Sequence, residues 1–489
     1  MNFTGNLNLD IAEVKRLLAN DDTVVYRSFE NKYTSNLKGI VIFTEILTGS
    51  ALIDRHIISP LINSDLRKIR QLPYLIDTVC EKILEANEVK RIPDINEALS
   101  SLLIGDTLIL LEGVPFACAA NTKTYPARSV SMPETENAIS GPKEAFCEVL
   151  VYNMGLLRRK VKNPKLKFKT LEVGKITKTR ICLSYIEGLA EDALIKKIED
   201  RLNQYEIDAS LDSNYLAELL KDTPYTPFKT IGTTERPDVV AGKLLEGRVA
   251  ILCDGSPFAL TAPFLFMENF QTSEDYYTNF YFATFIRALR YLAFFLSISL
   301  PGLYIALISF HKEMIPLTLL LSIVNSRDAV PFPAVLEMVM LLILFDLLRE
   351  AGLRLPKPVG GTIGTVGGIV LGQSIVSARI VSAEMIIIVA LCAITSFLTP
   401  KLDIEIILSR FFLLFLCATL GIYGYSIGLI ILFVHMSSLN SFDVPFLSYQ
   451  TAMKTQNAKD VYLRAPWWLM FRRPKAIQKK NVTRLRRKD

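Results

Sequence analysis

A regular series of small residues is the most informative local pattern in the sequence. A glycine recurs at every fourth position in the series Gly360, Gly364, Gly368 and Gly372. On an α-helix these positions form one stripe, against which a neighbouring backbone can pack closely. The residues that fall roughly opposite the stripe are Thr362, Val366, Gln373 and Ser377. Hydroxyl, amide and apolar groups on one face suit the lining and the hydrophobic constriction of a pore. The alternative is a tightly packed helix or loop without a pore. Glycine is also a poor helix former, so the helix itself is assumed in this interpretation.

Three ionisable residues lie in or beside the apolar stretch that precedes the glycines. Glu337 lies inside this stretch, whereas Arg349 and Glu350 follow it. An ionisable group at membrane depth needs a partner or water, so Glu337 is a candidate functional residue. Arg349 and Glu350 could pair with each other or with another subunit, or Arg349 could extend its guanidinium to the membrane interface.

No pattern in the sequence predicts catalysis, a cofactor or a metal site. Residues 364–368 are glycine-rich but lack the Lys-Ser/Thr of a phosphate-binding loop. The three histidines, His56, His311 and His435, are far apart. The seven cysteines have no CxxC spacing, which indicates a reducing compartment and no structural zinc. We therefore predict no catalytic residue, no cofactor and no metal.

Long apolar runs dominate the second half of the chain. Because a spanning helix needs about 20 mostly apolar residues, four segments qualify or nearly qualify. They are Leu289–Phe310, Ala334–Leu348, Ile380–Leu398 and Phe411–Met436. Pro316–Val324 is too short, and we expect the glycine-rich segment to be buried in the membrane. The sequence thus predicts a transmembrane domain over residues 286–440.

Flanking charges predict the topology of these spans. Basic residues follow the second span, and nine more lie over residues 472–488 of the tail, which spans residues 441–489, so we expect both places on the cytoplasmic side. Lys401, Asp403 and Glu405 carry little net charge and suit the opposite side. No signal peptide pattern occurs at the N-terminus, so both termini are expected in the cytoplasm. The basic tail either faces anionic lipid or is simply solvated, and we expect no nucleic acid as a partner.

The soluble part of the chain divides into two α/β lobes. Strands alternate with helices on both sides of a polar stretch, which predicts lobes over residues 1–125 and 126–285. Gly141-Pro142 predicts the start of a helix. The hairpin-like runs Leu108–Phe116 and Val249–Phe258 both end in an acidic-Gly turn and Pro-Phe. An internal duplication and a chance recurrence of a common turn both explain this similarity.

Several short motifs, in one order, resemble those of a known family, the A subunits of GerA-type spore germinant receptors. They include Glu235-Arg236-Pro237-Asp238, Asp254-Gly255-Ser256-Pro257-Phe258, Pro301-Gly302-Leu303-Tyr304, Val330-Pro331-Phe332-Pro333, Leu348-Arg349-Glu350-Ala351-Gly352 and Ala465-Pro466-Trp467-Trp468. The resemblance covers nearly the whole chain after residue 140. Arg379 and Asp443 depart from it, since a small residue and a glycine are expected there.

The resemblance implies a multi-pass protein of the spore inner membrane that assembles with a polytopic B subunit and a lipoprotein C subunit. It further implies a homo-oligomer that acts as a ligand-gated cation channel and triggers germination. Three alternatives remain: a paralogue similar to stage V sporulation protein AF, a transporter, and a scaffold. A transporter should show inverted repeats in the membrane half, and we find none.

Overall fold

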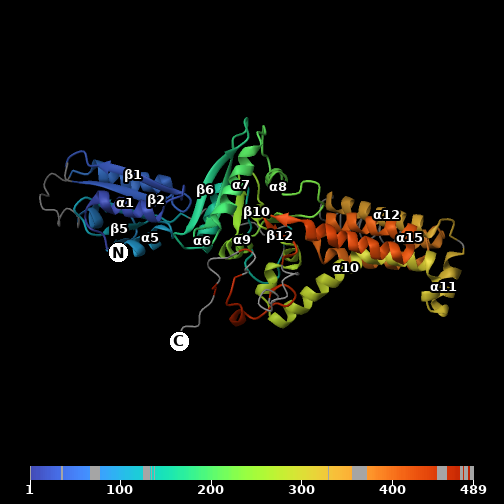
Figure 1. The fold of residues 1–489 in the computed structure, drawn as a ribbon. Coiled ribbons are helices and arrows are strands. Elements are labelled where there is room, and N and C mark those ends of the chain that lie inside the picture. The colour runs from blue at the N-terminus through green and yellow to red at the C-terminus, as the bar shows by residue number, and fades with distance from the viewer. Residues whose placement is uncertain are drawn as a thin grey trace.

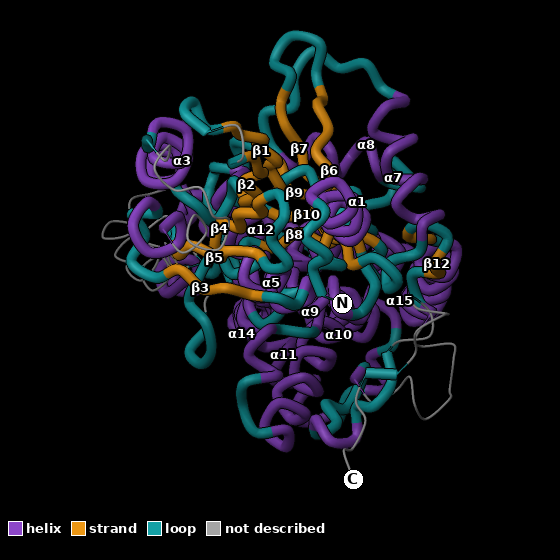
Figure 2. The backbone as a smooth tube through the Cα atoms, turned by 90° about the vertical axis from the view of Figure 1, so that its left-hand side faces the viewer, coloured by secondary structure: helices purple, strands orange, loops and turns teal. Residues whose placement is uncertain are grey.

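The computed structural model describes residues 2–34, 37–65, 78–124, 133, 135–136, 138–328, 330–354, 372–448, 460–473, 477 and 483–484. Its parts lie in a row, with lobe 1 at one end, lobe 2 in the middle and the long helices at the other end (Figure 1). The view turned by 90° looks along this row, so the sheets stand in front of the helices (Figure 2). The predicted fold class, two α/β lobes followed by a helical region, is confirmed.

Lobe 1 is a five-stranded antiparallel sheet covered by helices on both faces. Its elements are α1 (Leu7–Leu17), β1 (Val24–Glu30), β2 (Lys38–Thr44), α2 (Ser50–Ile53), η1 (Asp54–Ile58), α3 (Ser59–Asn63), η2 (Val79–Ile83), β3 (Val89–Ile92), α5 (Ile95–Leu102), β4 (Asp106–Leu111) and β5 (Ala117–Asn121). The strand order is β1-β2-β4-β5-β3. Alternate residues of β2 point to the two faces, so that Ile40 and Ile42 face α1 and α5, whereas Val41 and Phe43 join the core under α3 and η2.

Lobe 2 repeats this arrangement. Its elements are α6 (Leu150–Lys160), β6 (Leu166–Val173), β7 (Thr179–Ile186), α7 (Asp192–Gln204), α8 (Ser213–Leu220), β8 (Gly232–Thr234), α9 (Pro237–Leu245), β9 (Val249–Cys253) and β10 (Ala259–Ala262). The order β6-β7-β9-β10-β8 matches lobe 1 strand for strand. Val24 opens β1 and Leu166 opens β6, a shift of 142 residues, and the same shift relates Ile95 of α5 to Pro237 of α9. The shared strand order and the constant shift favour the internal duplication over a chance recurrence.

The two lobes are joined by buried contacts. Arg158 of α6 is fully buried and donates to Asp21, which precedes β1. The backbone N–H of Asp22 donates to the carbonyl of Phe168 in β6 at 3.1 Å. The predicted helix start at Gly141-Pro142 is wrong, because α6 begins only at Leu150. The Pro142 carbonyl instead accepts from Arg236 Nη2 at 2.8 Å, which holds this stretch against lobe 2.

Beyond lobe 2 the chain is mainly helical. The elements are η3 (Phe266–Phe270), η4 (Ser273–Tyr276), α10 (Phe280–Phe310), η5 (Lys312–Met314), α11 (Leu317–Arg327), α12 (Ala334–Arg354), α14 (Ala383–Phe397), η6 (Pro400–Leu402), α15 (Asp403–Ser438), β11 (Asn440–Ser441), β12 (Val444–Pro445) and η8 (Trp467–Leu469). Residues 372–377 are also helical. Within the described residues, two helices are long and apolar enough to cross a membrane, Phe280–Phe310 and Pro400–Ser438.

The helix α15 is folded back on itself at Gly421. This glycine has φ 62° and ψ −138°, outside the helical region. A Cβ added at Gly428 would lie 2.6 Å from Leu413 Cδ2, although the two positions would be about 22 Å apart in a continuous helix. We therefore describe α15 as a hairpin with one arm over residues 403–420, a tip at Gly421 and a second arm over residues 422–438.

Both ends of this hairpin reach the same short segment of lobe 2. The Lys229 N–H donates to Glu405 Oε1 at 3.2 Å, at the start of the first arm. Thr226 Oγ1 lies 3.1 Å from His435 Nε2, at the end of the second arm. Residues 405 and 435 would be about 45 Å apart in a straight helix. The two contacts thus establish the reversal independently of the backbone angles.

Two expectations about this region are wrong. Phe411–Met436 was expected to be one span, but the chain reverses inside it. Lys401, Asp403 and Glu405 were expected on the side opposite the lobes, yet Lys401 Nζ lies 2.8 Å from Glu136 Oε1, beside lobe 2. The physical reason is that the turn at Gly421 lies in a long run without a charged residue, so no charge marks it.

Candidate functional site

The end of the bundle farthest from the lobes is tied together by Glu337. This residue of α12 is fully buried, and its Oε1 accepts from the N–H and the Oγ of Ser382, both at 2.6 Å. Its Oε2 lies 3.5 Å from Arg327 Nη2 at the end of α11. One carboxylate therefore joins α11, α12 and the start of α14.

Nearer to the lobes, α12 is fastened to the hairpin by ion pairs. Arg410 of the first arm is 1% exposed and donates to Asp346 Oδ2 at 2.8 Å. Arg349 Nη1 lies 3.3 Å from Asp403 Oδ1, whereas Glu350 pairs with the exposed Arg354. Arg349 and Glu350, which could have paired with each other, thus have separate partners in this chain.

The junction between lobe 2 and the helices, which we call the junction, comprises residues 226–229, η3, η4, Lys401 and residues 460–467. At its centre lies Phe228, whose ring centroid is 5.9 Å from that of His435 and 6.4 Å from that of Phe266. Phe228 and Phe266 belong to one buried cluster, against which residues of both hairpin arms pack. Apolar packing therefore couples lobe 2 to the hairpin in addition to the two hydrogen bonds.

Asp275 of η4 is the charged centre on the other side of the junction. It is 2% exposed and accepts from Arg287 Nη2 at 3.1 Å and from Arg290 Nη1 at 3.0 Å. Arg287, which is fully buried in α10, also lies 3.1 Å from Asp460 Oδ1. The first turns of α10 are thus fixed both to η4 and to the C-terminal segment.

Lys401 joins the turn between α14 and α15 to Glu136, which accepts a hydrogen bond from Thr234 of β8 in lobe 2. Burial alone would raise the pKa of the Glu136 carboxyl, but Lys401, the Thr234 hydroxyl and Lys243 together hold it below its ordinary value. Two cavities of about 350 Å³ and 190 Å³ adjoin here, and both are lined by Lys401 and Thr234. The junction is therefore a charged and incompletely filled contact.

Lobe 2 also brings buried charges to the wall of the smaller cavity. Glu268 Oε1 lies 2.6 Å from Arg248 Nη1, and its Oε2 lies 3.1 Å from Lys243 Nζ. Burial lowers the pKa of the Lys243 ammonium, an effect that the carboxylate of Glu268 opposes. Among the described residues no group of His, Cys, Asp and Glu could hold a metal ion. The junction thus joins lobe 2 to the bundle through ion pairs, hydrogen bonds and apolar contacts.

Comparison with known proteins identifies one family over nearly the whole chain. The model of the family described as Bacillus/Clostridium GerA spore germination protein matches residues 12–476. Spore germination protein KA of Bacillus subtilis (strain 168) is 40% identical over 481 residues, which cover 98% of this chain and 88% of the relative. The chain belongs to the GerA spore germination protein family. Spore germination protein GerLA of Bacillus cereus is 32% identical over 99% of this chain and 98% of its own.

A solved structure is also similar to part of the chain. It is the crystal structure of the N-terminal domain of the A subunit of the Bacillus megaterium spore germinant receptor GerK3. The match has 32% sequence identity and a TM-score of 0.44, and covers 54% of this chain and 98% of that chain.

The pore candidates of this GerA family member lie partly outside the described residues. Thr362 and Val366 lie outside these residues, as do the predicted helix-packing residues Gly360, Gly364 and Gly368. The roles of all five stay predictions. Gln373 and Ser377 lie one turn apart in the helical segment 372–377, and both are exposed in the single chain. An added Cβ at Gly372 would meet no atom of the described residues within 4 Å, so none of them packs closely against this glycine.

Close helix packing occurs instead at glycines that the sequence analysis missed. A Cβ at Gly302 of α10 would lie 2.9 Å from Cys417 Sγ, and one at Gly424 would overlap the Leu416 carbonyl. The spacing of Gly421, Gly424 and Gly428 in the last apolar run was the available signal. Arg410, directly before that run, could likewise have been matched with the acidic residues inside the second apolar segment.

Arg379 and Asp443, the two departures from the family pattern, share an unusual backbone. Their φ angles are 54° and 65°, in the left-handed region that favours glycine. Asp443 Oδ1 lies 2.7 Å from Lys197 Nζ in α7. This pairing gives the aspartate a contact with lobe 2 that a glycine could not make.

Proposed function

We propose that this chain is the A subunit of a nutrient germinant receptor in the spore inner membrane and that it acts as part of an oligomeric cation channel. The single observation that carries the proposal is that lobe 2 holds both ends of the hairpin α15. Because the soluble domain contacts the membrane hairpin at both ends, a conformational change of this domain on binding would move the hairpin. The relatives named spore germination proteins support the biological role.

We propose a topology in which the lobes and both termini face the spore core. The helix α10 leads away from lobe 2, and α12 returns, since its last turns pair with Asp403 beside the lobe. Ser382, at the start of α14, lies at the far end beside Glu337. From there α14 returns to Lys401, and the hairpin leads out and back.

The partners follow from the same proposal. A polytopic B subunit would bind the nutrient, and a lipoprotein C subunit would complete the receptor. Further copies of this chain would surround the pore, and cations would pass through it. The exposed side chains of Gln373 and Ser377 support an arrangement in which this face meets a pore or another copy rather than its own chain.

The experiment that tests the channel changes Val366, the proposed hydrophobic constriction. Val366→Ala and Val366→Ser should ease wetting of the pore, so that developing spores release cations without a germinant. A matched control is Val389→Ala in α14, because Val389 is buried and its truncation thins the packed core. The control should lower receptor abundance, measured by immunoblot, without any leak. Normal abundance and no cation release in both Val366 variants would contradict the proposal.

A further inference from the structure

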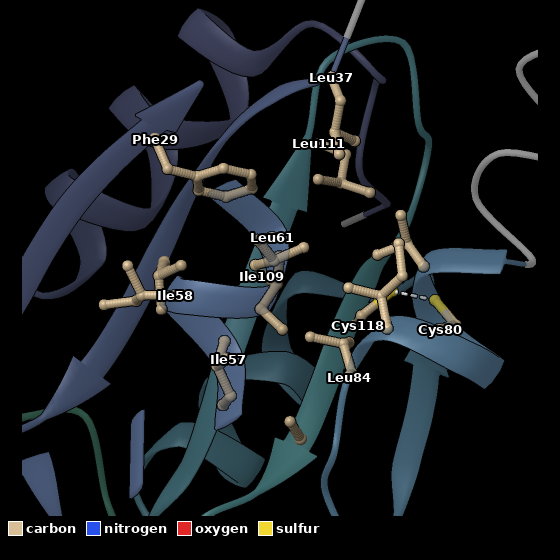
Figure 3. Close-up of a cluster of buried hydrophobic side chains, with 14 of the residues drawn as sticks. Phe29, Leu37, Ile57, Ile58, Leu61, Cys80, Leu84, Ile109, Leu111 and Cys118 are labelled. Atoms are coloured by element: carbon tan, nitrogen blue, oxygen red, sulfur yellow. Dashed lines mark hydrogen bonds between the residues drawn. The ribbon is translucent and has the colours of Figure 1, made fainter. Parts of the chain in front are cut away.

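Two cysteine side chains meet inside lobe 1. Cys80 lies on η2 and Cys118 on β5, and their Sγ atoms are 2.8 Å apart. Both belong to the apolar core that also contains Leu84, Ile109 and Leu111 (Figure 3). The Cys118 side chain is 1% exposed and that of Cys80 is 8% exposed. This contact is thus an interior feature of the lobe.

The separation of the two sulfurs is short for two independent thiols. Non-bonded carbon atoms pack best at about 3.5–4.0 Å, and sulfur is larger than carbon. A disulfide bond is about 2.05 Å long. The fold of lobe 1 therefore holds the two sulfurs closer than ordinary contact, within a small displacement of a covalent bond.

The duplicated lobe shows that packing does not require a thiol at this place. The shift of 142 residues relates Cys118 to Leu260, and the strand pairing agrees, because Cys118 lies opposite Ile109 and Leu260 lies opposite Ile251. Leu260 is fully buried in the core of lobe 2. The same position of the same fold thus accepts an ordinary apolar side chain.

We propose that Cys80 and Cys118 are a modification site that forms a reversible intramolecular disulfide. The oxidant would be a low-molecular-weight disulfide. A thiolate of the pair attacks one sulfur of the oxidant and releases one small thiol. The second cysteine then attacks the mixed disulfide and releases the other, so that the pair loses two electrons and two protons and the oxidant gains both.

The cross-link would fasten η2 to the sheet. It would close a loop between positions 38 apart in sequence, which contains β3, α5 and β4. Such a closure restricts the unfolded chain, so the oxidised lobe should resist unfolding more than the reduced lobe. The hydrogen bond with Cys80 and burial both raise the pKa of the Cys118 thiol. The thiolate is therefore scarce in the closed lobe, and oxidation should be slow.

The test uses the purified full-length chain in detergent, incubated with oxidised glutathione or with dithiothreitol. The protein is then unfolded, its free thiols are alkylated, and its peptides are analysed by mass spectrometry. The expected result is a peptide pair linked through Cys80 and Cys118 after oxidation, with a melting temperature raised by about 5–15 °C. The Cys118→Leu variant, which copies lobe 2, should fold like the reduced wild type and show no such rise.

Half-buried Cys147 is the internal control for non-specific oxidation, because it should form at most a mixed disulfide with glutathione. Full alkylation of Cys80 and Cys118 after prolonged oxidation would overturn the proposal. So would a linkage of either residue to another cysteine, or a temperature rise of equal size in Cys118→Leu.

Discussion

Arg410 of the hairpin and Asp346 of α12 form an ion pair with an Nη2–Oδ2 distance of 2.8 Å, and the arginine is 1% exposed. The two residues are separated by 64 positions in sequence. Removal of one partner of a buried pair leaves an uncompensated charge, which costs about 3–5 kcal/mol. The pair therefore holds the first arm of α15 against α12.

The first prediction exchanges these two charges. Arg410→Asp and Asp346→Arg should each reduce the amount of folded protein in membranes strongly, whereas the double exchange should recover part of it. The control is Arg354→Met, which breaks an exposed pair with Glu350 and should change stability by less than about 1 kcal/mol. Immunoblots of membrane fractions provide the measurement. Equal loss in the double exchange and the single variants would contradict the pairing.

The second prediction concerns the tip of the hairpin. Gly421→Ala should destabilise the protein by about 1–3 kcal/mol, because the backbone at this position is essentially restricted to glycine. The new methyl group would also lie 2.9 Å from Phe310 Cβ. Gly352→Ala in α12 is the control, since open space surrounds it, and should be neutral or slightly stabilising. Thermal unfolding in detergent should rank the two variants in this order; the reverse order would argue against the hairpin.

The third prediction is a dependence of stability on pH at the junction. The folded state lowers the pKa of Glu136, so its carboxylate stabilises the fold above the unfolded pKa near 4.3. This contribution is lost as the pH falls from there through the lower folded value. The melting temperature of the wild type should thus fall more steeply below about pH 4.5 than that of Lys401→Met, in which the partner of Glu136 is absent. Parallel curves for the two proteins would show that this ion pair is not the cause.

The fourth prediction removes the charge that two arginines share. Asp275→Asn should cost about 2–4 kcal/mol, since Arg290 loses its carboxylate and Arg287 keeps only Asp460. Glu274→Gln, at the adjacent position, serves as the control and should change stability by less than about 0.5 kcal/mol. Differential scanning calorimetry of both variants gives the comparison. A loss of similar size in Glu274→Gln would attribute the effect to the loop rather than to the shared charge.

The sequence was sufficient to predict the layers of this fold but not how its distant parts meet. Alternating apolar residues and turn signals predicted the lobes and the hairpin at Leu108–Phe116, because these signals are local. The Gly141-Pro142 helix was wrong, since the carbonyl of Pro142 binds a distant arginine, Arg236. Tertiary contacts of this kind leave no local signal.

For the candidate site, the sequence predicted single residues but not the partners that they contact. Glu337 was recognised as an ionisable residue that needs a partner. Its partners could not be predicted, because Arg327 precedes it and Ser382 follows it at separations that no helical period suggests. The reversal at Gly421 was also hidden, because no charged residue separates the two arms within this apolar run. Residues that pair across helices can be found from sequence only when charge, spacing and the path of the chain are considered together.

The hairpin α15 has a mechanical consequence. Its first arm contains 18 residues and is about 27 Å long, with its base at lobe 2 and its tip against Phe310 and His311 at the end of α10. A tilt of about 5° at the base would move the tip by about 2 Å, given a helix rise of 1.5 Å per residue. Both arms share the base at residues 226–229, and Arg410 joins the first arm to α12, so the two arms and α12 would move together. A small rotation of lobe 2 would thus be amplified into a displacement at the far end of the bundle, where Glu337 joins three helices.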